Sequence, residues 1–419
     1  MSPVDSLLRS ILSTAIISLC LLSCSAVSSK NKAPLSVAEL SDYFLDDAFE
    51  VSLSAIDAPE FFLELPEAYK SELDKIMAPL DGEFDRYSAL RAWAFGQIKD
   101  YQFEIAEAYS LGELNTNRRI NCLSFSVMFV AAARHVNMPA EFQLVYAPPY
   151  WDIDNKTWIN NQHIDVTGII KRKSSDTDPF LEPRHSLASG LSCINPTFVR
   201  SNSFRYVVDL NPAIVSMPLK RERLDDRQIL SLYFNNKGMA SLHAGDRGMA
   251  YAYTKKALLT DSGCAPAWNN LGVLFSRLGE LDYAENAFLK AIEMDSDASS
   301  ARSNIAHTYR RQGKYEQAIE MELLIAKFRN DNPYYHQFLA AQSLNDSDYE
   351  QAIEHLENAV ARKHNELAFY HELALAHQKL GHDDKVMQNL RKARRHAKGI
   401  QKQRFSGKLE ALQALVESP

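Results

Sequence analysis

The chain has 419 residues, of which 46% are hydrophobic and 24% are charged, an ordinary composition for globular domains. This length is enough for two or three domains with cores of their own, and the composition argues against disorder on a large scale. A formal net charge of −7 argues against nucleic acid as the main partner, because phosphate binding needs a surplus of Lys and Arg on one face.

The N-terminus has the pattern of an export signal over residues 1–23. Arg9 precedes an apolar run over 11–22, which has the length of a signal-peptide core and is too short to span a bilayer comfortably. The run ends in LLSCS, which resembles the lipobox of bacterial lipoproteins, with Cys24 as the lipidated residue. This resemblance implies a lipid-anchored protein of the cell envelope. Ser25 is similar to the residue found in lipoproteins of the outer membrane, on its periplasmic face.

An uncleaved membrane anchor is the alternative for this segment, because Asp5 offsets the charge of Arg9. Residues 24–40 are rich in Ser, Lys, Asn and Pro and have no periodicity over most of their length. This composition is typical of a flexible linker, and we expect a tether between the lipid and the first domain.

Residues 41–225 combine helical and strand-like patterns. Apolar residues recur with helical spacing in LRAWAFGQIKDYQFEIAEAYSL and SFSVMFVAAARHV. Strand-like runs follow in EFQLVYA, TWINNQHIDVTGII and FRYVVDL. Helices followed by short strands predict an α+β domain.

Cys122 stands at the start of the apolar helix LSFSVMFVAAARHV. The unpaired N–H groups of a helix N-terminus favour the thiolate, which is the nucleophilic form of cysteine. A cysteine nucleophile also needs a His that carries the proton and a group that orients the imidazole. His163 and Asp209 follow in separate strand-like runs and are the candidates. A buried Cys122 with a purely structural role is the alternative, since free cysteines are among the most buried residue types.

The order of these residues and their surroundings resemble the transglutaminase-like cysteine fold, a papain-related core. The matching positions are Asn121, Cys122, Ser124, Met138 and Pro139 in NCLSFSVMFVAAARHVNMPAEFQLV, and Asp209 in VVDLNP. The resemblance covers residues 89–212. It implies that Cys122 attacks peptide or isopeptide amide bonds, that His163 carries the proton and that Asp209 orients the ring. Hydrolysis and transfer to an amine both remain open.

Other residues compete for these roles. Asp165 is two residues beyond His163, a spacing at which side chains on one strand rarely meet as an oriented pair. His185 and His135 are weaker candidates, and His135 lies too far along the same helix to touch Cys122. Cys193 and Cys264 could pair in an oxidising compartment. No metal site or cofactor is predicted, because His residues have no Cys or acidic partners at ligand spacing.

From residue 226 the sequence repeats with a period of 34, and five copies fill residues 226–398. Equivalent places in the copies hold Gly245, Gly279, Gly313, Ser347 and Gly381. The period and the small residues resemble the tetratricopeptide repeat, which consists of two antiparallel helices. The resemblance implies an all-α solenoid that binds a protein or peptide. Residues 399–419 have the pattern of a helix that caps such an array.

Asn236, Asn270 and Asn304 occupy one position of the first three copies. A row of carboxamides can bind the backbone of an extended peptide, because each donates and accepts hydrogen bonds. Hydrogen bonds between repeats are the alternative for these residues. For the whole chain, a scaffold that binds envelope proteins without catalysis is likewise the alternative to an enzyme.

Overall fold

The computed structural model describes residues 35–49, 56, 62–104, 107–146, 163–171, 197–200, 203–210, 221–295, 299–397 and 399–416. Residues 1–34, with the expected signal and Cys24, lie outside these ranges, as do His185 and Cys193. No helix within the described part of the chain is both long enough and apolar enough to cross a membrane.

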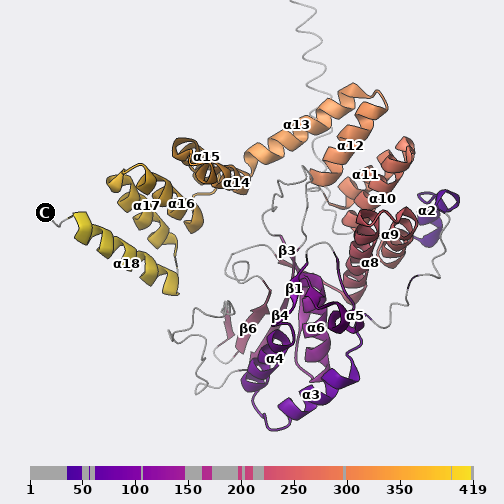
Figure 1. Ribbon diagram of the computed structural model, residues 1–419, viewed down its shortest axis with the longest axis horizontal. Coiled ribbons are helices and arrows are strands. Elements are labelled where there is room, and N and C mark those ends of the chain that lie inside the picture. The colour runs from indigo at the N-terminus through magenta and orange to yellow at the C-terminus, as the bar shows by residue number, and fades with distance from the viewer. Residues whose placement is uncertain are drawn as a thin grey trace, which may run out of the picture.

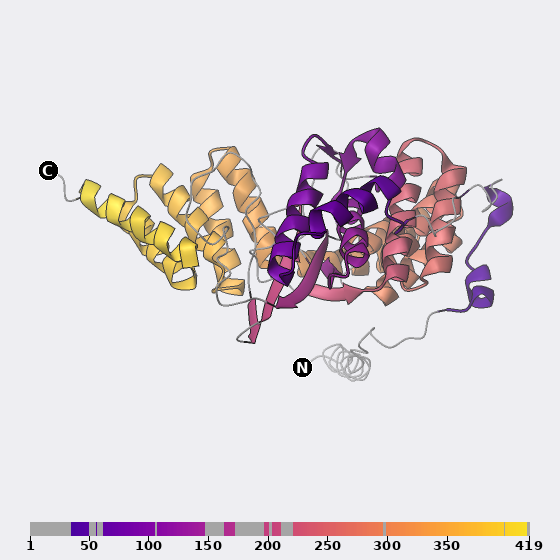
Figure 2. The same ribbon diagram turned by 90° about the horizontal axis from the view of Figure 1, so that it is seen from below.

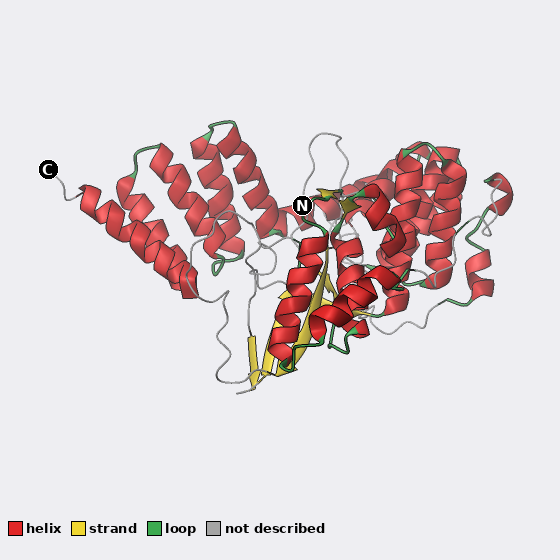
Figure 3. Cartoon of the chain, turned by 60° about the horizontal axis from the view of Figure 1, so that its bottom comes forward, coloured by secondary structure: helices red, strands yellow, loops and turns green. Residues whose placement is uncertain are grey.

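The middle of the chain combines helices with a five-stranded sheet (Figures 1 and 3). The helices are α3 (Glu67–Met77), α4 (Glu83–Gln97), α5 (Leu111–Asn117) and α6 (Cys122–His135). The sheet has the order β5-β6-β4-β3-β7, and its neighbouring strands are antiparallel. Its strands are β3 (Glu141–Val145), β4 (His163–Lys171), β5 (Thr197–Arg200), β6 (Ser203–Val208) and β7 (Arg221–Leu224). Two short parallel strands, β1 (Gln102–Phe103) and β2 (Arg119–Ile120), form a separate pair.

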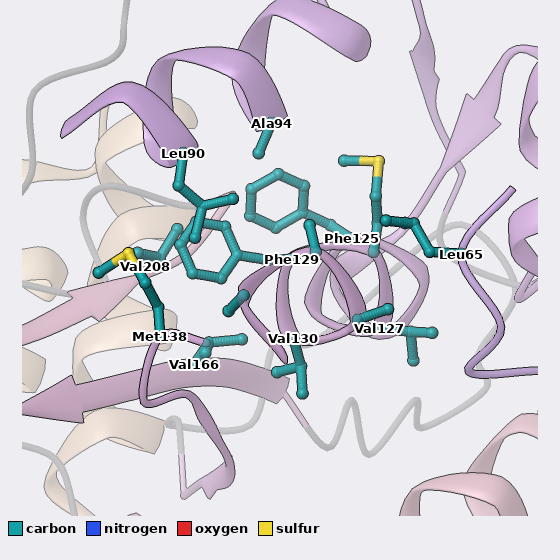
Figure 4. Packing of buried hydrophobic residues seen from close by; sticks show 14 of the residues in the cluster. Leu65, Leu90, Ala94, Phe125, Val127, Phe129, Val130, Met138, Val166 and Val208 are labelled. Carbon is teal, nitrogen blue, oxygen red and sulfur yellow. The ribbon is translucent and has the colours of Figure 1, made fainter. Parts of the chain in front are cut away.

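Helix α6 lies at the centre of the core of this α+β domain (Figure 4). Phe125 and Phe129 are fully buried and lie toward Leu90 and Ala94 of α4. Ser126 of α6 donates a hydrogen bond of 3.3 Å to a backbone carbonyl of β4. Each large apolar side chain buried in this way stabilises the fold by about 1.5–3 kcal/mol. Packing on both sides therefore fixes α6, and with it the helix N-terminus that Cys122 occupies.

Paired helices form the C-terminal half of the chain (Figure 1). The pairs are α8 (Asp226–His243) with α9 (Arg247–Thr260), α10 (Ala265–Leu278) with α11 (Leu281–Met294), α12 (Ser299–Arg311) with α13 (Tyr315–Asp331), α14 (Pro333–Asn345) with α15 (Tyr349–Arg362), and α16 (Leu367–Lys379) with α17 (Asp383–His396). A last helix, α18 (Gly399–Val416), packs beside α17. The equivalent glycines and Ser347 all adopt positive φ, from 61° to 100°, in the turns within the pairs.

The first helix of the array, α8, also belongs to the α+β domain. Ile229 is buried in the core around α6, whereas Phe234 and Leu242 are buried in the core of the repeats. Asp225, which alone separates β7 from α8, caps the helix through its side chain. No flexible linker therefore separates the two parts.

The segment 35–49 packs against the repeats and not against the α+β domain (Figures 1 and 2). It contains α2 (Val37–Ser41) and the 3₁₀ helix η2 (Asp46–Ala48). Phe49 stacks on Tyr251 of α9 with a centroid distance of 4.1 Å, and Tyr43 meets Trp268 of α10 edge to face at 4.9 Å. Residues 41–49, which we predicted to belong to the α+β domain, thus lie against the repeats, as do Leu35 and Leu40 of the predicted tether. The sequence did not reveal that Tyr43 and Phe49 pack on the repeats.

Candidate active site

Cys122 is the first residue of α6 and is half-buried with a free thiol. The preceding residue, Asn121, caps the helix, because its side-chain oxygen accepts a 2.9 Å hydrogen bond from the Ser124 backbone N–H. The cap leaves the thiol at the positive end of the helix dipole, the setting expected for a nucleophilic cysteine.

His163 begins β4 and lies beside Asp209. Its Nε2 is 2.5 Å from Oδ2 of Asp209. The Asp209 side chain is fully buried and that of His163 is 13% exposed. Packing of α6 on β4 brings the ring near the Cys122 thiol, which raises the pKa of His163. The structure therefore brings together the three residues predicted from the sequence.

The antiparallel register of β4 and β6 positions Asp209. Val166 pairs with Val208, which is the last residue of β6. Asp209 therefore follows the end of β6 and lies near the start of β4. The Thr167 hydroxyl donates a 2.8 Å hydrogen bond to the backbone carbonyl of Tyr206 and strengthens this register. A shift of one residue would move Asp209 to the opposite face.

The surroundings of His163 favour a protonated imidazole. Burial lowers the pKa of His163, but the hydrogen bonds to Asp209 and Cys122 and the charges of these groups raise it to about 10. An imidazolium next to a cysteine favours the thiolate form in general. The arrangement can therefore hold a nucleophile, a proton donor for a leaving group and a carboxylate that fixes the ring.

Asp165 and His135, the competing residues within the described ranges, have other partners. The Asp165 carboxylate is fully buried and accepts a 2.8 Å hydrogen bond from Nε of Arg221. Burial raises the pKa of Asp165 to about 6, although Arg221 lowers it. His135 Nε2 lies 2.8 Å from Oδ1 of Asp74. Arg221 is a site residue that the sequence did not suggest, because no motif surrounds it and only the β3–β7 pairing brings it to Asp165.

Two of the three repeat asparagines bond between repeats. Asn270 donates to Asn235 at 2.7 Å, and Asn304 donates to Asn269 at 2.9 Å. Asn270 is also only 7% exposed, so it is poorly placed to bind a peptide. The structure therefore favours the inter-repeat alternative for these two residues, while Asn236 is half-buried on α8.

The second described cysteine, Cys264, differs from Cys122. Its thiol is free and buried at the start of α10, and burial raises the pKa of Cys264 to about 11. It therefore stays protonated at neutral pH. Within the described ranges, no three His, Cys, Asp or Glu side chains form a group that could hold a metal ion.

Comparison with known families matches two profiles described as tetratricopeptide repeat, at residues 265–297 and 287–320. The C-terminal region of the chain thus contains tetratricopeptide repeats. Both matched ranges lie between α10 and α13, within the repeats whose 34-residue period the sequence shows. No curated protein matches the chain.

Solved structures similar to this chain include those of repeat proteins. A crystal structure of MamA protein has 18% identity and a TM-score of 0.23, over 40% of this chain and 91% of that one. MamA residues 41 to the end from Desulfovibrio magneticus RS-1 has 15% identity and a TM-score of 0.23, over 41% and 96%. YrrB, described as a TPR protein with an unusual peptide-binding site, has 13% identity and a TM-score of 0.23, over 39% and 84%. TM-scores this low carry no weight for the function of this chain.

Proposed function

We propose that this protein is an interaction protein whose tetratricopeptide repeats bind a protein or peptide partner. The repeats themselves carry this proposal, since stacked helix pairs of this kind form extended surfaces for protein binding. A photo-crosslinking residue in place of Asn236 on α8 tests it in cells. We expect a discrete cross-linked product from this variant. The product should be missing when the photo-crosslinking residue is placed instead at the exposed Lys402 on α18. The same products at both positions would contradict specific binding.

A second function, thiol catalysis, is favoured by one observation: the His163 ring is hydrogen-bonded to Asp209 and lies near Cys122. We propose that the α+β domain is a transglutaminase-like cysteine hydrolase or transferase. Its substrates would be peptide or isopeptide amides of proteins that the repeats hold nearby, because tethering raises the local substrate concentration.

In the first step of the proposed reaction, the Cys122 thiolate attacks the amide carbonyl carbon and forms a tetrahedral intermediate. The C–N bond breaks as the His163 imidazolium gives its proton to the leaving amine, and a thioester remains on Cys122. Water or an amine then attacks the thioester and gives its proton to the neutral His163 ring. The products are a carboxylic acid or a new amide, together with the regenerated thiolate. Asp209 holds the ring in place during both transfers.

Labelling with iodoacetamide tests the proposed nucleophile. We expect rapid alkylation of Cys122 at pH 7 in the wild type and alkylation slower by about tenfold or more in His163→Ala, because the variant lacks the proton acceptor. Cys264 serves as an internal control, since its buried thiol reacts slowly in both proteins. Slow labelling of Cys122 that does not depend on His163 would leave only the binding function.

We further propose that the protein is anchored in the cell envelope by lipid on Cys24, on the periplasmic face of the outer membrane. The LLSCS motif supports this proposal. Mass spectrometry of the mature N-terminal peptide should show that the chain is cleaved between Ser23 and Cys24 and that Cys24 is acylated. A mature protein that retains residues 1–23 would contradict it and favour the uncleaved anchor.

A further inference from the structure

A lysine stands where the other repeats have an apolar residue. Adding 34 to position 237, and then 34 again at each step, gives the equivalent positions in the later copies, namely Leu271, Ile305, Leu339 and Leu373. Leu271, Ile305 and Leu373 are buried in the repeats. Lys237 is also buried, with 8% exposure, although it carries a charge.

Lys237 is buried against the α+β domain, next to the segment 107–113. Its Nζ lies 3.2 Å from Oε1 of Glu107 and 2.8 Å from Oε1 of Glu113. The same ammonium lies 5.3 Å from the ring centroid of Tyr109 and 5.8 Å from that of Tyr233. We call Lys237, Glu107 and Glu113 the charge clamp. It joins the first repeat helix to one short segment of the α+β domain.

The segment 107–113 is held on its other side by the first turn of α6. The side-chain amide of Asn121 donates a 2.9 Å hydrogen bond to the backbone carbonyl of Glu107. The Ser124 hydroxyl accepts a 2.8 Å hydrogen bond from the backbone N–H of Tyr109. Both side chains are buried, and they flank Cys122 in the sequence. A continuous set of contacts therefore runs from α8 to the cap of the helix that carries the thiol.

If only folding stability mattered at position 237, an apolar residue would be favoured over lysine. The buried ammonium of Lys237 loses hydration that its attraction to the partly exposed Glu107 and Glu113 only partly restores, and apolar residues at buried places are often as stable or more stable. Leucine at position 237 would match the later repeats. A lysine at this place indicates that the position serves the contact with Glu107 and Glu113 and not only the packing of α8.

We propose that Lys237 is a positioning residue for the thiol site, acting through the charge clamp on Asn121 and Ser124 and so on the placement of Cys122. This inference rests on the proposed thiol chemistry of Cys122. The first repeat helix is then a structural part of the site. A partner bound to the repeats near α8 has a direct route by which to change the reactivity of the thiol.

Iodoacetamide labelling of the full chain between pH 5 and 9 tests the proposal in Lys237→Leu. We expect the alkylation rate of Cys122 at pH 7 to fall about tenfold, because small displacements of reacting groups cost that much or more. The pH profile should shift toward that of His163→Ala. Lys237→Arg, which keeps the charge, should recover most of the rate.

Lys255→Leu is the matched control. Lys255 is another shielded lysine of a repeat helix, and it pairs with Asp46 on the segment 35–49, which packs on the repeats. We expect this variant to label Cys122 at the wild-type rate. An equal loss of rate in both leucine variants would show a general effect of destabilised repeats and would overturn the proposal.

Glu107→Gln removes one of the two ion pairs of the charge clamp from the opposite side and tests the proposal if Lys237→Leu fails to fold. A rate within twofold of wild type in the folded clamp variants, with a clear loss in His163→Ala, would overturn the role of Lys237 and leave the thiol site standing. A rate that responds to neither His163 nor Lys237 would overturn the thiol chemistry itself.

Discussion

Individual residues at the site could be predicted where a motif surrounds them. Cys122 was identified by its place before an apolar helix, and His163 and Asp209 by their order on later strands. Arg221 could not be predicted, because its link to Asp165 depends on β7 pairing with β3 across a long stretch of sequence. Charge pairs of this kind follow from strand register, which short sequence patterns do not reveal.

The protonation of His163 predicts how stability depends on pH. The pKa of His163 is about 10 in the folded protein, against an ordinary value of 6.5. At pH values between 6.5 and 10, the folded chain therefore keeps a proton on His163 that the unfolded chain has released. The free energy of unfolding falls as the pH rises from 6.5 toward 10. Denaturation midpoints at pH 6, 8 and 10 measure this fall. His163→Gln should reduce the slope over this window, and an unchanged slope would contradict the assigned proton.

Arg221→Met should be strongly destabilising, by about 3–5 kcal/mol, because it leaves the buried Asp165 carboxylate without its partner. Arg223→Met is the matched control on the same strand. Arg223 pairs with Glu141 at 2.9 Å, but both side chains are well exposed, so about 0–1 kcal/mol is expected. Urea denaturation of the two variants compares them. Equal losses would show that Asp165 does not depend on Arg221.

Among the elements, the repeat helices were the most predictable, because a 34-residue period fixes both their number and their turns. The turn residues illustrate this. Gly279 has a φ of 100°, and a Cβ added there would meet no atom within 4 Å, so only backbone conformation requires glycine. The inter-repeat bonds of Asn270 and Asn304 were less predictable, because a conserved spacing does not say which neighbour a side chain meets.

Gly279→Ala should therefore destabilise the repeats by about 1–2 kcal/mol, the cost of a left-handed conformation for a residue with a Cβ. Gly407→Ala is the control, since Gly407 lies inside α18, also has free space around its Cα and has no positive φ. We expect that change to be neutral or to stabilise by about 1 kcal/mol. Thermal unfolding followed by circular dichroism would distinguish them, and a neutral Gly279→Ala would contradict the strained turn.

At the scale of the whole molecule, the sequence predicted two parts but not how they join. Helix α8 contributes to both cores, and the segment 35–49 crosses to the repeats although it precedes the α+β domain in the chain. Apolar residues in such a segment predict that they are buried. They do not predict which part of the molecule buries them. Long-range contacts of this kind come only from the folded structure.

The packing of the segment 35–49 predicts that Phe49→Ala destabilises the repeats by about 3–5 kcal/mol, as expected for a buried aromatic ring. Phe103→Ala is the control, because the Phe103 ring is 63% exposed and its loss should cost no more than about 0.5 kcal/mol. Denaturant unfolding of both full-length variants provides the comparison. Similar midpoints would show that the segment does not support the repeats.

The most direct test of the account is the pH dependence of Cys122 alkylation in the wild type and in His163→Ala. If Cys122, His163 and Asp209 act together, the wild-type rate should exceed that of His163→Ala at every pH from 6 to 9, because the imidazole accepts the proton of the attacking thiol. At pH 7 we expect the rate in His163→Ala to be lower by about tenfold or more. Identical profiles for the two proteins would contradict a catalytic site at Cys122.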